Sequence, residues 1–368
     1  MKRLLSAALT AMLSLSGGHV IAHGPDAPKH QIANIGDLLL ESGSVVRTVR
    51  ISYVTHGKLT AAKDNAVLLL HGYGANHHGF DGLIGPGKAF DTDRYFVIVP
   101  DAFGNSQIGF EHSTSPTTSG LGMGFPQYNG RDMVAAQYKL VTQALGIPRV
   151  AAIAGISMGA DHSVQMAVSY PDFADRIVPI VGGAYWGTQK LFWSSQIQAV
   201  LQTCEGWLGG QYKDNPRTCA ANALATMIPY FYSREWWQQN IVTPEIFAQW
   251  RKGWGDFYLD IQDARDLLYL TRALATSDLA KTPGFDGNAP AALKSIRART
   301  LFVVSPHDQF FLPTQIEEQR RIIPDARIVS IDSPAGHLIC CGADAQAYWI
   351  MDKTIHAFLR EPVRSASR

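Results

Sequence analysis

Several features that mark particular classes of protein are scarce or missing in this sequence. Its 368 residues carry 32 Lys and Arg against 31 Asp and Glu, a formal net charge of +1, and contain no basic run. This balance argues against nucleic acid as a partner and against strong steering of anionic ligands. Beyond the N-terminus, no apolar stretch is long enough for a membrane helix. With 46% hydrophobic residues and no internal repeat, the chain suits one large domain carrying an insertion, or about two to three smaller units.

Cysteine is also scarce, and the four positions match none of the usual zinc patterns. Cys204 and Cys219 lie in one region, so we expect a disulfide between them, worth about 3 kcal/mol in the loop-entropy model. Cys340 and Cys341 either form a strained vicinal disulfide or remain reduced and buried. We expect neither a metal nor a cofactor.

The N-terminus has the pattern of a secretory signal. A charged tip, Met1-Lys2-Arg3, is followed by a short apolar stretch over residues 4–15 and by small residues before His23. The stretch falls short of the ~20 residues that span a bilayer, although an N-terminal membrane anchor remains the alternative. We therefore predict a signal peptide at residues 1–22, no integral membrane segment after its removal, and a periplasmic or secreted protein.

A serine motif is the most informative feature of the chain. An apolar run from residue 150 breaks into residues 155–159, which read Gly-Ile-Ser-Met-Gly, and then into a helix-like segment that ends at Tyr170-Pro171. This resembles a nucleophile elbow, in which Ser157 sits on a sharp strand-to-helix turn and the glycines let the backbone pass. With 33 glycines in the chain the motif also arises by chance, so a plain tight turn is the alternative.

Other strand-like runs supply the context that the motif needs. They are residues 65–70, which lead into His71-Gly72-Tyr73-Gly74; residues 95–101; residues 300–304, which lead into Ser305-Pro306-His307-Asp308; and residues 326–331, which precede Gly336-His337. Serine, then acid, then histidine, each just beyond a strand, is the chain order of the α/β-hydrolase fold. We predict that fold, with a mostly parallel central sheet and helices on both faces.

An inserted region interrupts the alternation of strands and helices. Between residues 182 and 293 strand-like runs vanish, and seven of the eight tryptophans fall there: Trp186, Trp193, Trp207, Trp236, Trp237, Trp250 and Trp254. We interpret residues 182–293 as a helical lid, and residues 23–181 and 294–368 as the hydrolase core. The tryptophans either build the core of the lid, or a few of them line an apolar pocket above Ser157 that binds an acyl chain or aromatic ring.

These residues can be assigned roles in acyl transfer. Ser157 is the predicted nucleophile, His337 the general base and then acid, and Asp308 the carboxylate that orients the imidazole. The backbone N–H groups of Met158 and Tyr73 are the predicted oxyanion donors, and losing one such donor typically costs ~3 to 4 kcal/mol.

Each assignment has an alternative. Asp308 could be a turn or cap aspartate, with Asp332 as its nearest substitute, and His337 could be a buried structural histidine. The remaining histidines near the oxyanion turn and the following loops are interpreted as pocket-rim or surface residues. They are His77, His78 and His112.

Several blocks of the chain resemble one branch of the α/β hydrolases, the homoserine O-acetyltransferases. The blocks are residues 91–101 (Asp-Thr-Asp-Arg-Tyr-Phe-Val-Ile-Val-Pro-Asp), Phe125-Pro126, residues 131–134 (Arg-Asp-Met-Val) with Gln137, residues 155–159, and residues 268–273 (Leu-Tyr-Leu-Thr-Arg-Ala). The resemblance spans most of the mature chain and implies the same triad, Ser157, Asp308 and His337.

Two departures from that family bear on the substrate. The resemblance implies an aspartate after the catalytic histidine that recognises the amino group of homoserine, whereas Leu338 stands there. It also implies a lid arginine for the substrate carboxylate, and none is found near residues 225–228. An apolar residue cannot pair with an ammonium group, so we expect acyl transfer to water.

The sequence therefore predicts an exported serine hydrolase acting on a small-molecule carboxylic ester through an acyl-enzyme. An O-acyltransferase with an alcohol acceptor is the alternative, and a noncatalytic binding protein on the same scaffold is a third. A second copy of the chain stays open as a partner.

Overall fold

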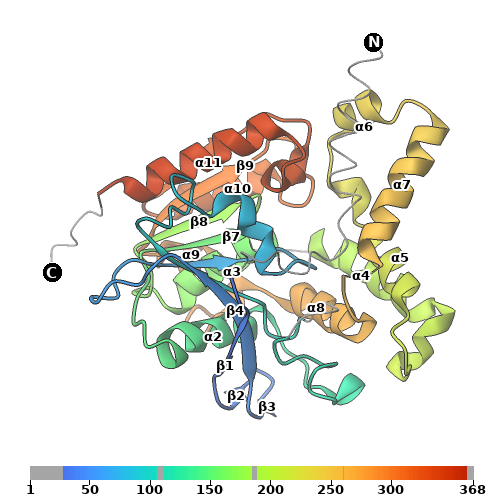
Figure 1. The fold of residues 1–368 in the computed structure, drawn as a ribbon, viewed down its shortest axis with the longest axis horizontal. Helices are drawn as coiled ribbons and strands as arrows, with labels where there is room; N and C mark the ends of the chain where they lie inside the picture. The colour runs from blue at the N-terminus through green and yellow to red at the C-terminus, as the bar shows by residue number, and fades with distance from the viewer. Residues whose placement is uncertain (1–27, 106–111, 185–188, 260, 363–368) are drawn as a thin grey trace.

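A computed structural model describes residues 28–105, 112–184, 189–259 and 261–362 (Figure 1). The predicted signal peptide therefore lies outside the described residues. The strands are β1 (Gln31–Asn34), β2 (Leu38–Leu39), β3 (Val45–Val46), β4 (Arg50–His56), β5 (Ala66–Leu70), β6 (Phe96–Pro100), β7 (Ala152–Ile156), β8 (Arg176–Ile180), β9 (Arg299–Val304) and β10 (Ala326–Ser330). The helices are α2 (Gly130–Lys139), α3 (Met158–Ser169), α4 (Gln189–Thr203), α5 (Arg217–Ala225), α6 (Arg234–Asn240), α7 (Pro244–Tyr258), α8 (Ala264–Thr276), α9 (Ala289–Lys294), α10 (Pro313–Ile322) and α11 (Ala345–Arg360).

One eight-stranded sheet forms the centre of the described structure, in the order β1-β4-β6-β5-β7-β8-β9-β10. The pairs β1–β4 and β4–β6 are antiparallel, and every later pair is parallel. The predicted α/β-hydrolase fold with a mostly parallel sheet is thus confirmed.

The central strands are apolar throughout because helices cover both faces of the sheet. All five residues of β5 are buried, and so are those of β7 and β8. Along β5, Leu68 and Leu70 pack in one hydrophobic cluster with α2 and α3, while Val67 and Leu69 pack in a second cluster with α11 and the short helix η1 (His77–Leu83). Because β5, β7 and β9 run parallel to one another, they end at the same edge of the sheet, where the loops that follow them meet.

The described part of the inserted region contains helices and connections only, from α4 to α9. Helices α6 and α7 extend away from the sheet (Figure 1). Helix α8 instead packs on the core, where Tyr269 donates its hydroxyl to the carbonyls of Met123 and Phe125 at 2.9 and 2.7 Å. The helical character agrees with a lid, and the domain limits at 182 and 293 stay a prediction.

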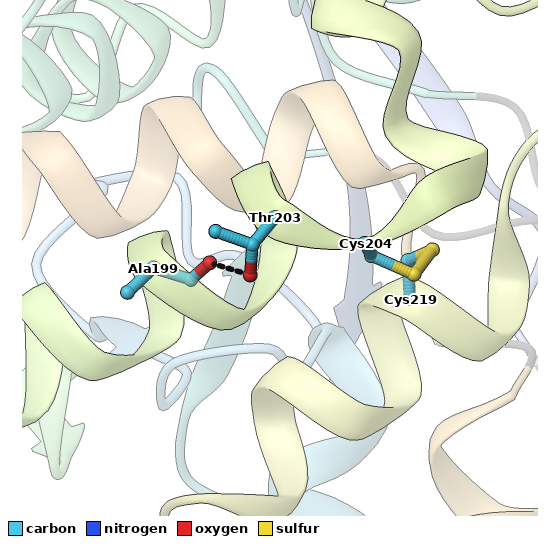
Figure 2. The surroundings of a disulfide bond; sticks show 4 residues. All are labelled: Ala199, Thr203, Cys204 and Cys219. Carbon is cyan, nitrogen blue, oxygen red and sulfur yellow. Dashed lines mark hydrogen bonds between the residues drawn. A yellow bond between two sulfur atoms is a disulfide. The ribbon is translucent and has the colours of Figure 1, made fainter.

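The expected disulfide joins Cys204, just after α4, to Cys219 in α5 (Figure 2). Cys340 and Cys341 are not bonded, and only Cys340 is buried, so the expectation that both are buried is wrong for the exposed Cys341. None of the described helices is both long enough and apolar enough to cross a membrane.

Candidate active site

Ser157 occupies the turn between β7 and α3 in a backbone conformation that residues other than glycine rarely adopt. Its backbone angles are φ +55° and ψ −113°, outside the regions that L-residues favour. A Cβ on Gly155 would lie 1.8 Å from the carbonyl oxygen of Gly159, and a Cβ on Gly159 would lie 1.8 Å from that of Leu70. The glycines are therefore required by the close approach of the backbone, as in a nucleophile elbow.

The structure brings the three predicted triad residues together. His337 Nε2 lies 2.9 Å from Ser157 Oγ, and His337 Nδ1 lies 2.8 Å from Asp308 Oδ2. Asp308 follows β9, and His337 lies in the short helix η7 (Gly336–Cys341) after β10. The substitute acid, Asp332, instead pairs with His307 at the surface, at 2.8 Å.

Asp308 is held as an acceptor on both of its oxygens. The backbone N–H groups of Phe310 and Phe311 donate to Oδ1, at 2.8 and 3.1 Å, while Oδ2 faces His337. An ionised carboxylate is acceptor-only, so it assigns the imidazole proton to Nδ1. The lone pair on His337 Nε2 then points at the hydroxyl of Ser157.

The turn after β5 lies beside Ser157. A Cβ on Gly72 would lie 3.6 Å from Ser157 Cβ. His71 fixes this turn, because its Nε2 accepts from the N–H of Ala102 at 3.0 Å and its Nδ1 donates to the carbonyl of Gly72 at 2.9 Å. Burial lowers the pKa of His71, which keeps this tautomer neutral.

Both predicted oxyanion donors belong to segments next to Ser157. Met158 is the first residue of α3, where an N–H has no acceptor within the helix. Tyr73 follows Gly72, and its hydroxyl donates to Thr271 Oγ1 at 2.5 Å, while Thr271 donates to the carbonyl of Leu267 at 2.7 Å. Burial raises the pKa of Tyr73, so this hydroxyl remains a donor.

Aromatic rings surround the imidazole. The ring centroids of Phe310, Phe311 and Phe231 lie 4.8, 6.2 and 6.5 Å from that of His337. The ring centroid of Trp193 lies 6.2 Å from that of Phe310 and 5.9 Å from that of Tyr73. This tryptophan therefore borders the site.

Other tryptophans build the lid, as the first interpretation predicts. Trp250 lies 4.7 Å from Trp237, and Trp236 stacks on Tyr232 at 3.7 Å, both measured between ring centroids. That Trp193 lines a pocket for an acyl chain or aromatic ring stays a prediction. Trp186 lies outside the described residues.

The other histidines differ partly from expectation. His77 is buried, and its Nδ1 lies 3.0 Å from Asp101 Oδ1, so it is not a rim or surface residue. Burial of Asp101 raises its pKa, but the interactions with His77, His71 and Ser52 together outweigh burial and hold the pKa at about 2. His78 is partly exposed and pairs with Asp81. Among the described residues, no three His, Cys, Asp or Glu side chains are grouped so as to hold a metal ion.

The sequence does not predict the groups that hold Asp308 and the turn after β5 in place. Thr271 lies in the block 268–273, but nothing in that block shows that its hydroxyl reaches Tyr73. The N–H groups that hold Asp308 belong to backbone and leave no sequence signal. His71 precedes the predicted oxyanion turn, which was its only signal.

Comparisons with known proteins place the chain in a family. The family model described as "alpha/beta hydrolase fold" matches residues 65–342. The homoserine O-acetyltransferase of Symbiobacterium thermophilum is 33% identical over 362 residues, covering 88% of this chain and 92% of that protein. The ethyl acetate hydrolase of Pseudomonas veronii is 29% identical over 349 residues, covering 92% of this chain and 97% of that protein.

Solved structures of ester hydrolases also resemble this chain over most of its length. The acetyl esterase MekB matches with a TM-score of 0.81 and 28% identity over 92% of this chain and 98% of its own. An acetylester hydrolase from Corynebacterium glutamicum matches with a TM-score of 0.79 and 26% identity, over 90% of this chain and 96% of its own. The chain therefore belongs to the alpha/beta hydrolase family. Within it, homoserine O-acetyltransferases and ester hydrolases are its relatives along most of its length.

Proposed function

We propose that the protein is an exported serine hydrolase that cleaves a small carboxylic ester through an acyl-enzyme. The observation that carries this proposal is the relay from Asp308 through His337 to Ser157, with distances of 2.8 and 2.9 Å, at the turn between β7 and α3. A serine hydroxyl is a weak nucleophile, and this arrangement supplies both a base and a group that orients the base.

In the first half of the reaction, Ser157 Oγ attacks the ester carbonyl while His337 Nε2 takes its proton. The negative charge that develops on the carbonyl oxygen is stabilised by the N–H groups of Met158 and Tyr73. The imidazolium, stabilised by Asp308, then protonates the departing alcohol and leaves an acylated Ser157. In the second half, His337 activates a water molecule, which releases the carboxylic acid.

Two features favour a neutral ester over an amino-acid substrate. Leu338, directly after His337, is apolar and 8% exposed, so it offers no partner to an ammonium group. The rings nearest His337 belong to Phe310, Phe311 and Phe231, which present apolar surface to the substrate. Relatives named as an ethyl acetate hydrolase and as an acetyl esterase support a short acyl group.

Transfer of the acyl group to an alcohol is the second candidate, because homoserine O-acetyltransferases are among the relatives. The two reactions differ in whether water reaches the acyl-enzyme. A burst of p-nitrophenol followed by a slow phase that added alcohols accelerate, and that stalls without them, would favour transfer. Steady turnover in buffer alone favours hydrolysis.

Replacing Ser157 with alanine tests the proposal. We expect turnover of p-nitrophenyl acetate to vanish, since the alanine side chain has no hydroxyl to acylate, while the circular dichroism spectrum stays that of the wild type. A retained rate would remove Ser157 from the mechanism. A series of esters with longer acyl chains should show declining rates, and equal rates for all lengths would contradict a defined acyl pocket.

Export is proposed from residues 1–22 and is supported by the Cys204–Cys219 disulfide, because such bonds persist in oxidising compartments. The mass of the protein recovered from the periplasm or medium should correspond to a chain that begins at His23. A full-length mass in the cytoplasmic fraction would contradict export.

A further inference from the structure

Two thiols lie on the short helix that carries His337. Cys340 and Cys341 are the last two residues of η7, and their Sγ atoms lie 2.7 Å apart without a bond. Cys340 is 2% exposed, whereas Cys341 is exposed. A reagent in solution can therefore reach one sulfur directly, and the second sulfur lies immediately behind the first.

The buried thiol is in contact with the backbone of the histidine. A 3₁₀-helix has about three residues per turn, so residues three apart eclipse each other, and Cys340 lies beneath His337. Its Sγ lies 3.4 Å from the carbonyl oxygen of His337 and is oriented to donate to it. The N–H of His337 donates to the carbonyl of Phe231 at 3.0 Å. A change in the backbone at Cys340 therefore acts on the residue that positions the imidazole.

We propose that Cys340 and Cys341 form an oxidative modification site, which a disulfide-bearing oxidant closes to a vicinal disulfide that lowers turnover by displacing His337. The effect on turnover rests on the proposed function of His337, whereas closure of the disulfide does not.

Closing this ring strains the peptide unit that joins the two cysteines. The Cα atoms of neighbouring residues are about 3.8 Å apart, whereas disulfide-bonded cysteines usually have Cα atoms at least about 4.4 Å apart. The sulfurs need only a small shift from 2.7 Å to a bond of about 2.05 Å, so the adjustment falls on the peptide units of η7. Strained disulfides of this kind are readily reduced again, which is the property of regulatory disulfides.

The chemistry balances with a disulfide as the oxidant. The thiolate of Cys341 attacks one sulfur of the oxidant, breaks its S–S bond and expels one thiolate. The thiolate of Cys340 then attacks the sulfur of Cys341 and expels the second thiolate. Two cysteine thiols lose two electrons and two protons, and the oxidant becomes two thiols. The hydrogen bond with Cys341 and burial raise the pKa of Cys340, which favours Cys341 as the first nucleophile.

The test uses glutathione disulfide as the probe on the purified full chain. Each sample is divided, and one half is denatured and alkylated for mass spectrometry of the peptide that contains residues 340 and 341. The other half is assayed with p-nitrophenyl acetate. We expect that peptide to lose two hydrogens while kcat falls about tenfold or more, since a 1 Å misplacement of a catalytic group can cost ~100-fold. Added thiol should restore both.

Matched variants separate the parts of the proposal. Cys341→Ser should keep its rate at every oxidant concentration, and Cys340→Ala should likewise keep its own starting rate. A double variant, Cys204→Ser with Cys219→Ser, should respond to oxidant as the wild type does. Ser157→Ala should still close the ring although it is inactive, so that a failure of the triad assignment is distinguished from a failure of the thiol chemistry.

Three results would overturn the proposal. The first is complete ring closure with an unchanged rate. The second is a peptide that stays reduced, or that carries only a glutathione adduct on Cys341, at all oxidant concentrations. The third is inhibition of Cys341→Ser to the same extent as the wild type.

Discussion

Asp308 shows how a single side chain defines the chemistry of its neighbours. Its side chain is 2% exposed, and both of its oxygens accept hydrogen bonds. Asp332, only a few residues before His337 in the chain, is 86% exposed at its side chain and pairs with His307. Burial and the donated N–H groups, rather than closeness in sequence, therefore make Asp308 the residue that orients the imidazole.

Asp308→Asn should lower kcat by about 10⁴ and leave the fold intact. The asparagine oxygen can still accept from the N–H groups of Phe310 and Phe311, which directs the amide NH₂ at His337 Nδ1 and imposes the wrong tautomer. The measurement is kcat for p-nitrophenyl acetate, with Asp332→Asn as the control that keeps wild-type activity. The assignment is wrong if the two variants lose activity equally.

Gly159→Ala should cost at least about 3 kcal/mol of unfolding free energy, because its Cβ would lie 1.8 Å from the Leu70 carbonyl oxygen. Gly253, in α7, has nothing within 4 Å of an added Cβ. Gly253→Ala should therefore change stability by no more than about 1 kcal/mol, in the stabilising direction. Urea denaturation of both variants measures the difference, and comparable stabilities would contradict the close packing of the elbow.

At the scale of elements, α8 connects the inserted region to the turn after β5, the proposed oxyanion turn. Thr271 on this helix accepts from Tyr73, and Asp266 accepts from Ser115 Oγ at 3.0 Å. The helix therefore fixes the loop after β5 from outside the sheet, while His71 fixes the same loop from within.

Thr271→Val removes the acceptor of a buried hydroxyl. We expect a stability loss of about 1–3 kcal/mol, because the Tyr73 hydroxyl loses its partner. We also expect kcat to fall about ten- to a hundredfold with little change in KM, because the Tyr73 N–H is a proposed oxyanion donor, and such a donor stabilises the transition state more than bound substrate. Thr276→Val, on an exposed position of the same helix, is the control. A rise in KM with an unchanged kcat would contradict this role.

The sequence predicts elements well where the physical signal is local. The runs at 65–70, 300–304 and 326–331 appear as β5, β9 and β10, because buried parallel strands are apolar along their whole length. The antiparallel strand β1 is harder to predict, since it is largely exposed and carries no apolar run.

The residues of the site also differ in how well the sequence predicts them. Ser157, Asp308 and His337 each follow a recognisable strand, so chain order alone brings them to one edge of the sheet. Their supports depend on contacts between distant segments, such as the hydrogen bond between Tyr73 and Thr271, 198 residues apart. Nothing in the local sequence encodes such a contact.

At the scale of the whole molecule, buried histidines link folding to pH. His162 in α3 is 1% exposed, and its Nε2 has no hydrogen-bond partner among the described residues. Burial lowers its pKa to about 3, from about 6.5 in an unfolded chain. Below pH 6.5 the unfolded state therefore binds more protons, so stability is full above that pH and declines as the pH falls toward 3.

Between pH 7 and pH 5, His162 alone should lower the free energy of unfolding by about 2 kcal/mol. His162→Leu should remove that part of the slope, which urea titrations at several pH values measure. An unchanged slope in the variant would show that His162 does not titrate on unfolding.

The central claim is that His337 activates Ser157 for attack on an ester, and reaction with a fluorophosphonate probe tests it most directly. Peptide mass spectrometry should find one phosphonyl group per chain, on Ser157, with labelling that slows at least ~1,000-fold in a folded His337→Ala variant. An enzyme that turns over esters while its label lies on another residue, or whose labelling is indifferent to His337, would contradict the account.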